Sequence, residues 1–325
     1  MTPSDPLSST PVTQSNAGAA LNLRPLSLGE MLDRAFHIYF KHIVAFTAIV
    51  AVVFIPSLLI SYFQSRGLIE FYINLFQQSS HSPSSPPDMS KLQSYMPSDT
   101  WIFIQYGLLI LGFPFAYGAV VAAVSKAYLG LPISFKESYR YALRRWLSIL
   151  ILIVLWIIAG FVAALVMIAG FAIFFAILIP ASAVLMKGGA LLGILLSILT
   201  IVTMLAAIGL AIMLYLTAAI SFIAVVIENV DPVTAFGSSF PRVFGRQQFW
   251  RGFALALALM GINLGASLVG AGGGALLAYA FKSPALYLIL AGTTSLFFGP
   301  FAVVAAAIYY YDIRIRREGY DLQML

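Results

Sequence analysis

The chain has 325 residues, of which 61% are hydrophobic and only 9% are charged. A soluble domain carries about 25% charged residues, so this composition excludes an ordinary water-soluble fold and indicates a membrane protein. The net charge of +6 does not indicate nucleic-acid binding, because the basic residues occur in short clusters at the ends of apolar runs. The chain has no cysteine, which excludes disulfides and thiolate metal sites.

Residues 1–23 are rich in Ser, Thr and Pro and contain no Lys or Arg. They therefore lack the basic region of a signal peptide, and we expect a disordered cytoplasmic tail. The remainder, 24–325, is predicted to be a single membrane domain whose first span is an uncleaved anchor.

Six stretches contain no Asp, Glu, Lys, Arg or His: Ile43 to Ser65, Thr100 to Ser125, Trp146 to Met186, Gly188 to Ile227, Gly252 to Phe281 and Ser283 to Tyr311. Each is longer than the ~20 residues that a helix needs to cross the hydrocarbon core, which predicts an all-α transmembrane bundle. The third and fourth stretches are unusually long. A six-span interpretation places their outer turn at Pro180, Lys187, Gly188 and Gly189, and an eight-span alternative breaks them near Gly160 or Gly170 and near Gly209.

The basic residues predict the orientation. If the spans alternate from a cytoplasmic start, 14 of the 18 Lys and Arg residues lie inside, and only Arg66, Lys91, Lys187 and Lys282 lie outside. This bias is the one described by the positive-inside rule, so both chain ends are expected in the cytoplasm.

A motif of the form P-[LI]-S-x-x-E begins at Pro25 and again at Pro132, and a degenerate copy with Gly237 in place of Glu begins at Pro232. Ser followed three residues later by Glu is a capping box, which marks a helix start; in the third copy, Thr234 takes the position of the cap. After the first two caps, apolar and charged residues fall on opposite helical faces, so we expect amphipathic helices that lie flat at the cytoplasmic interface with their apolar side chains in the acyl boundary. In the third copy, Pro241 is expected to break or kink the helix before Trp250.

The repeat divides the domain into three units, 24–130, 131–229 and 230–325, each consisting of an interfacial helix, a span, an outer turn and a returning span. The outer loop of the first unit, 66–99, has a Ser/Pro-rich centre and could begin with a short helix from Leu68 to Phe76. In the fifth span, Gly261 and Gly265, together with Gly270 and Gly274, have the small-xxx-small spacing of close helix packing, either internal or between copies of the chain.

The sequence predicts no catalytic, cofactor or metal site, because the acidic residues and histidines are scattered and lie outside the apolar runs. Glu228 at a span end is interpreted as a boundary residue. Asp312 and Arg316 are four apart and are expected to pair on one helical face. The candidates for contact with a partner or with anionic lipid head groups are the charged residues of the cytoplasmic segments: Arg24, Glu30, Asp33, Arg34, Arg140, Arg144, Arg145, Asp312, Arg314, Arg316 and Arg317.

Three segments resemble the bacterial membrane domain named after glycerophosphoryl diester phosphodiesterases: residues 24–36 (RPLSLGEMLDRAF), 125–130 with 141–145 (SKAYLG and YALRR), and 310–322 (YYDIRIRREGYDL). The resemblance covers nearly all of 24–325 and implies the fold and a bacterial inner-membrane location. In that family a separate soluble barrel carries the catalysis, and this chain shows no such domain, so hydrolysis is not implied. The long middle spans and Pro241 depart from the family pattern.

Two functions remain from the sequence. The first is a non-catalytic scaffold or regulatory membrane module that acts on a protein partner or as a homo-oligomer, and the second is a transporter or binder of a lipid or small solute. The amphipathic helices favour the first, and the prolines within the spans, which could break helices around a binding site, favour the second.

Overall fold

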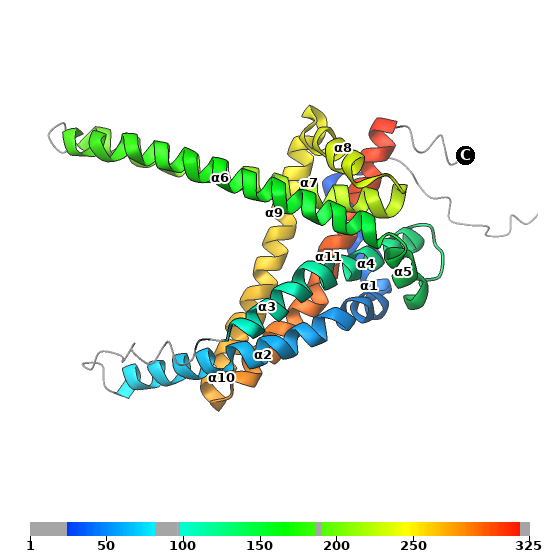
Figure 1. The fold of residues 1–325 in the computed structure, drawn as a ribbon, viewed down its shortest axis with the longest axis horizontal. Helices are drawn as coiled ribbons and strands as arrows, with labels where there is room; N and C mark the ends of the chain where they lie inside the picture. Colours follow the sequence, from blue (N-terminus) through cyan, green and yellow to red (C-terminus); the bar gives the residue numbers. More distant parts are fainter. Residues whose placement is uncertain (1–24, 82–95, 97, 186–189, 319–325) are drawn as a thin grey trace, which may run out of the picture.

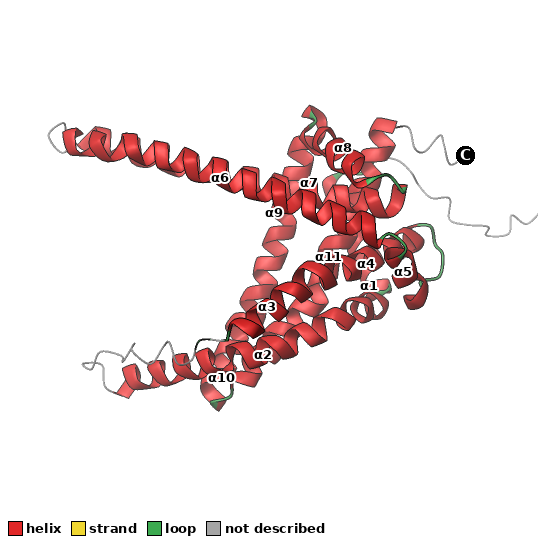
Figure 2. Ribbon diagram, viewed as in Figure 1, coloured by secondary structure: helices red, strands yellow, loops and turns green. Residues whose placement is uncertain are grey.

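The computed structural model describes residues 25–81, 96, 98–185 and 190–318. Within these ranges the chain consists of helices joined by short loops and contains no β-strand (Figure 2). Six stretches are long and apolar enough to cross a membrane: Ile43–Phe76, Asp99–Tyr128, Trp146–Ala176, Ser197–Glu228, Arg246–Phe281 and Pro284–Arg317. This confirms the prediction of an all-α bundle with six spans, and the protein is a multi-pass membrane protein.

The first unit begins with the short helix α1 (Leu28–Lys41), which leads into the long helix α2 (Ile43–His81). Its returning span consists of α3 (Asp99–Gly107), a π-helical turn η2 (Leu108–Gly112) and α4 (Phe113–Tyr128). The π-helical turn ends two residues before Pro114, which has no amide hydrogen to donate to the preceding turn. The helix therefore adjusts at this proline without breaking.

The other two units follow the same order. The second contains α5 (Phe135–Leu143), α6 (Trp146–Leu185) and α7 (Ala190–Glu228). The third contains α8 (Pro232–Phe244), then α9 (Arg246–Ser267), a second π-helical turn η3 (Leu268–Gly272) and α10 (Gly273–Phe281), and finally α11 (Pro284–Glu318).

The second unit has two spans, which excludes the eight-span alternative in the described part of the chain. Helices α6 and α7 run without a break past Gly160, Gly170 and Gly209. The prediction that Pro180 lies in the outer turn is wrong, because α6 continues through it to Leu185; residues 186–189, where the rest of that turn was predicted, lie outside the described part. In an apolar environment every unpaired backbone group is costly. A proline inside the helix removes one backbone hydrogen bond, whereas a turn at the same place would leave several backbone groups unpaired.

Helix α2 also continues further than predicted. It runs through Arg66 to His81, so the expected loop does not begin at Arg66 and there is no separate helix from Leu68 to Phe76. The charge at Arg66 marks a change in polarity, but residues 66–81 contain no proline and only one glycine, so nothing in them ends the helix. The Ser/Pro-rich part of the predicted loop, residues 82–95, lies outside the described part.

The packed core lies at one end of the molecule, where α1, α4, α7 and α11 meet (Figure 1). Its largest fully buried side chains include Met31, Phe46, Phe301, Tyr309 and Tyr310. At the other end the α6–α7 hairpin diverges from α2, α3 and α10 (Figure 1). Only 11% of the apolar stretch of α6 is buried within the protein, against 50% of that of α7, so α6 is the most peripheral span.

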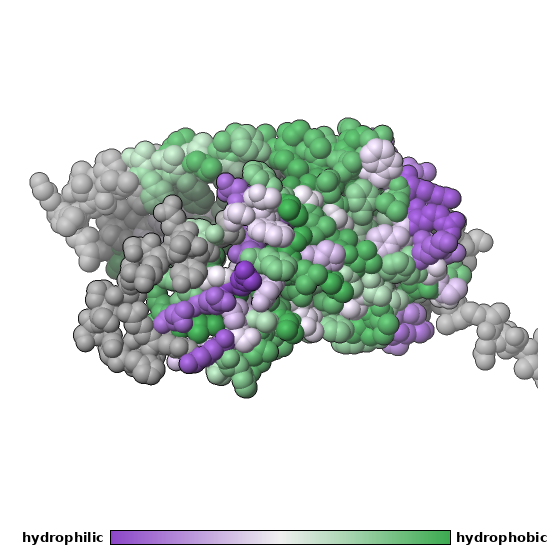
Figure 3. Space-filling view, turned by 60° about the horizontal axis from the view of Figure 1, so that its bottom comes forward, coloured by the Kyte–Doolittle hydropathy of each residue, from purple (hydrophilic) through white to green (hydrophobic). Residues whose placement is uncertain are grey.

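The surface has the layering of a membrane protein. In Figure 3, hydrophilic residues gather at the right-hand end and in a second group further left, and an apolar band covers most of the length between them. Large apolar side chains are exposed along α6, for example Ile158, Phe161 and Val166. Such an exposed apolar band is suited to lipid rather than to water.

The glycines of the fifth span fall into two groups. A Cβ atom on Gly270 would lie 2.7 Å from the Thr294 side chain, and one on Gly274 would lie 2.9 Å from the backbone of Tyr287. These glycines therefore allow η3 and α10 to pack closely on α11, within the chain. Gly261 and Gly265 have no such neighbour within 4 Å.

Helix α8 ends later than predicted from Pro241. The helix includes Pro241 and ends at Phe244; the next residue, Gly245, has a ψ of 135° and turns the chain into α9. The N–H of Gly245 donates a hydrogen bond to the Pro241 carbonyl at 3.1 Å, which closes the last turn. The break still lies before Trp250, but glycine rather than proline makes it.

Candidate functional site

The three short helices lie at the same end of the molecule as the last turns of the last span. Figure 1 shows α1, α5 and α8 at the same end of the molecule as the end of α11. We call this region the basic end; it comprises α1, α5, α8, residues 309–317 of α11, Glu228 at the end of α7 and Arg246 at the start of α9. The candidate residues of the sequence analysis all belong to it or border it, except Arg24, which lies outside the described part.

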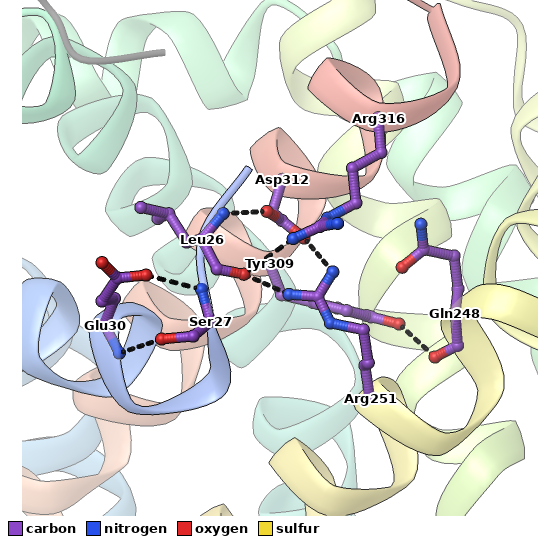
Figure 4. A network of polar contacts seen from close by, with 8 residues as sticks. All are labelled: Leu26, Ser27, Glu30, Gln248, Arg251, Tyr309, Asp312 and Arg316. Atoms are coloured by element: carbon purple, nitrogen blue, oxygen red, sulfur yellow. Dashed lines mark hydrogen bonds and ion pairs between the residues drawn. The ribbon is translucent and has the colours of Figure 1, made fainter. Parts of the chain in front are cut away.

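The most buried charge of the basic end is Asp312 on α11, which is 1% exposed. Its carboxylate accepts a hydrogen bond from the Leu26 N–H at 2.7 Å and one from Arg316 Nε at 2.9 Å, and it forms an ion pair with Arg251 at 3.2 Å (Figure 4). The predicted pairing of Asp312 with Arg316 is thus present. The contacts with α9 and with the segment before α1 could not be read from sequence spacing.

The two arginines also bind the backbone beside Asp312. Arg316 donates a hydrogen bond to the Leu26 carbonyl at 2.9 Å, and Arg251 donates to the same oxygen. Together with Asp312 they bind both backbone polar groups of Leu26, the N–H and the C=O, ahead of α1. A buried carboxylate is costly unless charged partners and hydrogen bonds compensate it, and here both are present. Asp312 and Arg316 are therefore structural anchors.

Helix α1 starts with the predicted capping box (Figure 4). The Ser27 N–H donates to the Glu30 carboxylate at 2.7 Å, and the Glu30 N–H donates to Ser27 Oγ at 3.3 Å. Beyond the cap, Met31, Ala35 and Tyr39 are buried against the core. The expectation that this apolar face lies in the acyl boundary is wrong, because it packs against α11, where Phe36 stacks on Phe301 with ring centroids 4.4 Å apart.

The charged face of α1 divides into a packed and an open part. The Arg34 guanidinium lies over the Tyr128 ring at 4.6 Å, and Tyr128 stacks on Tyr311 at 4.7 Å. This cation–π contact fixes Arg34 against the bundle. Asp33 is exposed, so of the two neighbouring charges it is the one accessible to a partner.

Helix α5 carries the same motif but does not form the box. Ser134 is the residue before the helix, yet its side chain makes no cap hydrogen bond. The Glu137 carboxylate instead pairs with Lys126 of α4, and this hydrogen bond and the positive charge hold the pKa of Glu137 below its ordinary value. The predicted second capping box is therefore wrong, because a cation from another helix competes for the carboxylate.

The three arginines of α5 and the following turn have different surroundings. Arg145 donates a hydrogen bond to the Val225 carbonyl at 3.1 Å and lies over the Tyr141 ring, which ties this turn to α7. Arg140 and Arg144 are exposed, and neither side chain makes a hydrogen bond or ion pair with another described residue. They are two exposed cations on α5 and the turn after it, and Lys41, Lys136 and Arg246 are exposed elsewhere in the basic end.

Glu228, at the end of α7, is a second carboxylate anchor. It accepts a hydrogen bond from the Tyr310 hydroxyl and forms ion pairs with Arg242 at 3.2 Å and Arg314 at 3.4 Å. Its partners come from α8 and α11, so it joins the second and third units. The sequence analysis identified Arg314 as a candidate but missed this pairing; the signal was that Tyr310 and Arg314 are four residues apart on one face.

Helix α8 is attached through its backbone as well as through Arg242. It begins at Asp231, whose carboxylate accepts a hydrogen bond from the Thr234 N–H at 2.8 Å. The expected cap at Thr234 is therefore wrong by three residues, because Asp231, the residue before Pro232, caps the helix. At the other end, Arg317 donates to the Pro241 carbonyl at 2.7 Å.

A cavity of about 350 Å³ opens between α4, α5 and the end of α7. Its charged lining consists of Lys126, Arg140 and Arg144 with one carboxylate, Glu137, and its remaining polar lining includes Ser125, Ser138 and Tyr141. A second, shallower hollow lies along α5 between Phe135, Tyr139 and Leu143 and also contacts Arg140 and Arg144. The two arginines were predicted from the sequence. Lys126 and the hydroxyl groups were not, because they come together with the arginines only when α4 packs on α5.

Among residues 25–81, 96, 98–185 and 190–318, no three His, Asp or Glu side chains lie together as metal ligands. The basic end thus combines two compensated carboxylates with a group of open cations. Comparison with protein families, characterised proteins and solved structures finds no match to this chain. Its function is therefore argued from its own residues.

Proposed function

We propose that the chain is a non-catalytic module of the bacterial inner membrane that organises or regulates a partner protein through its basic end. The observation that carries the proposal is that Asp312 and Glu228 are both engaged in internal contacts that hold the short helices in place. Such anchors make a rigid surface rather than a reactive one. The polar residues left exposed on α1, among them Asp33, His37 and Lys41, form a stripe on which a partner can dock.

The proposal places the basic end and both chain ends in the cytoplasm. It rests on the positive-inside rule, because Arg140, Arg144, Arg246 and Arg317 all belong to the basic end, whereas Lys282 lies in the turn between α10 and α11 at the other end of two spans. Since the chain has no cysteine, single replacements can be labelled cleanly. In intact cells, a membrane-impermeant maleimide should label Lys282→Cys and spare Lys41→Cys; the reverse pattern would invert the proposed orientation.

The partner is tested by native mass spectrometry of protein gently extracted from its own membrane. We expect a stoichiometric protein partner that is lost when Asp33 and His37, both exposed on the stripe, are replaced by alanine and retained by the matched variant Lys282→Ala. Thermal unfolding of both variants separates loss of binding from loss of folding. If the double variant is folded and retains the partner, or if no partner is ever present, the proposal fails.

A second candidate function, binding or transport of a lipid or small solute, is favoured by the cavity between α4, α5 and α7. Its lining includes three cations and several hydroxyl groups, which suits an anionic ligand. This function does not require a protein partner.

A further inference from the structure

We propose that the cavity between α4, α5 and α7 binds the phosphate group of an anionic phospholipid, with one acyl chain lying along the apolar side of α5. This inference deepens the second candidate function and is independent of the protein partner. It rests on the charge of the cavity, on the apolar hollow next to it and on the position of α5 between two spans.

The charge of the cavity suits an anion. Three of its lining side chains are cations, and the single carboxylate, Glu137, is paired with Lys126. Because Arg140 and Arg144 make no hydrogen bond or ion pair within the described part of the chain, their donors are available. Arginine forks and a lysine ammonium group are the side chains that bind phosphate oxygens most effectively.

The hydroxyl groups of the cavity add directional contacts. Ser125 Oγ already accepts a hydrogen bond from the Tyr311 hydroxyl at 3.0 Å, which leaves its own hydrogen for an acceptor in the cavity. Tyr141 is 39% exposed at the rim, where its ring also contacts Arg145. The site can therefore donate to several phosphate or glycerol oxygens at once.

The apolar hollow distinguishes a lipid from a soluble phosphate. It shares Arg140 and Arg144 with the cavity. Its other lining residues are Lys136 and three residues with large apolar groups, Phe135, Tyr139 and Leu143. Phe135 is 47% exposed and Leu143 is 53% exposed, although both are on the apolar face of α5. A ligand that covers both regions must combine an anionic head with an apolar tail.

The location of α5 fits such a ligand. It connects α4, whose span ends at Tyr128, with α6, whose span begins at Trp146. Trp146 is 53% exposed, as expected for an aromatic side chain at the level of lipid head groups. Residues between these two span ends lie where the phosphates of a bilayer leaflet are found.

The test is a titration of the purified full chain in detergent, with bound lipid counted by native mass spectrometry. Phosphatidylglycerol is the anionic probe and phosphatidylcholine the zwitterionic one. We expect selective retention of phosphatidylglycerol, and a loss of affinity of about tenfold or more when Arg140 and Arg144 are both replaced by glutamine. The matched control, Lys41→Gln with Arg246→Gln, removes two exposed charges from the same region but outside the cavity and should retain the lipid.

The other outcomes overturn the proposal in distinguishable ways. Equal losses in the two double variants would show general charge attraction and no site. If glycerol 3-phosphate binds as tightly as phosphatidylglycerol and Leu143→Ser weakens neither, the ligand is a soluble phosphate and the acyl part is wrong. If lipid is retained selectively but independently of Arg140 and Arg144, lipid binding as a function survives and this site does not. None of these results depends on the protein partner.

Discussion

Helices α1 and α5 begin with the same motif and have opposite surroundings. The apolar face of α1 is covered by α11, with Met31 1% exposed, whereas that of α5 leaves Leu143 53% exposed. The Glu of the motif caps its own helix in α1 and pairs with another helix in α5. A repeated motif therefore specifies where a helix begins, and the neighbouring helices decide whether that helix becomes part of the core or a surface for a ligand.

The end of α11 is the physical cause of the difference. On the side of α1 it presents Asp312 to the backbone of Leu26, and Phe301 further along α11 packs against Phe36. Helix α5 packs on α4, and the turn at its end is held by the hydrogen bond from Arg145 to α7. Within the described part of the chain, the outer face of α5 has no other helix against it and is therefore uncovered. We therefore expect changes on the apolar face of α1 to act on stability and changes on the outer face of α5 to act on lipid binding.

The largest effect is expected at the anchor of α1. Asp312→Asn removes the charge that compensates Arg251 and Arg316, whose side chains are 23% and 30% exposed. Breaking a buried ion pair costs about 3 to 5 kcal/mol, and the partial exposure of both arginines puts the loss near the lower value. Chemical denaturation in detergent micelles, followed by tryptophan fluorescence, measures it against Asp33→Asn, which is exposed and should change little. Equal stabilities of the two variants would show that the network is not an anchor.

A smaller effect separates the two apolar faces directly. Met31→Ala leaves a cavity in the core and should lower the free energy of unfolding by about 2 kcal/mol. Leu143→Ala removes an exposed side chain and should change it by less than about 0.5 kcal/mol. The same denaturation experiment gives both values. A large loss for Leu143→Ala would mean that the outer face of α5 is covered by a second copy or by another protein.

The smallest effect concerns the caps. Ser27→Ala removes the hydroxyl group that accepts from the Glu30 N–H and should cost about 1 kcal/mol. Ser134 makes no cap hydrogen bond, so Ser134→Ala should cost only about 0.3 kcal/mol. Comparing the two unfolding midpoints checks the assignment. If both substitutions cost the same, the box at α5 forms in the protein and the pairing of Glu137 with Lys126 does not replace it.

The spans were predictable because lipid excludes charge. Each of the six runs without a charged residue is longer than a membrane span requires, and each corresponds to one of the six spans in the structure. The start of α1 was predictable because a capping box is a local pattern, and the Asp312–Arg316 pair because its residues are one turn apart on a helix. Each of these features depends only on residues that are near one another in the sequence.

The rest could not be predicted because it depends on contacts between units. Glu228 appeared to be a boundary residue, and only the packing of α7, α8 and α11 brings Arg242 and Arg314 to it. Lys126 was not among the candidates, although its approach to α5 both removes the second cap and completes the cavity. Likewise, the glycine spacing was similar in the two pairs of α9–α10, but only Gly270 and Gly274 face another helix closely.

The hydrogen bond between Leu26 and Asp312 joins residues 286 positions apart. During synthesis, the first span therefore leaves the ribosome long before Asp312, which holds the segment ahead of α1, has been made. During that interval the apolar side of α1 has no α11 to cover it and must rest on the bilayer surface or on an insertion factor. Assembly is then completed by the last helix, because α1 can reach its final packing only after α11 has been synthesised.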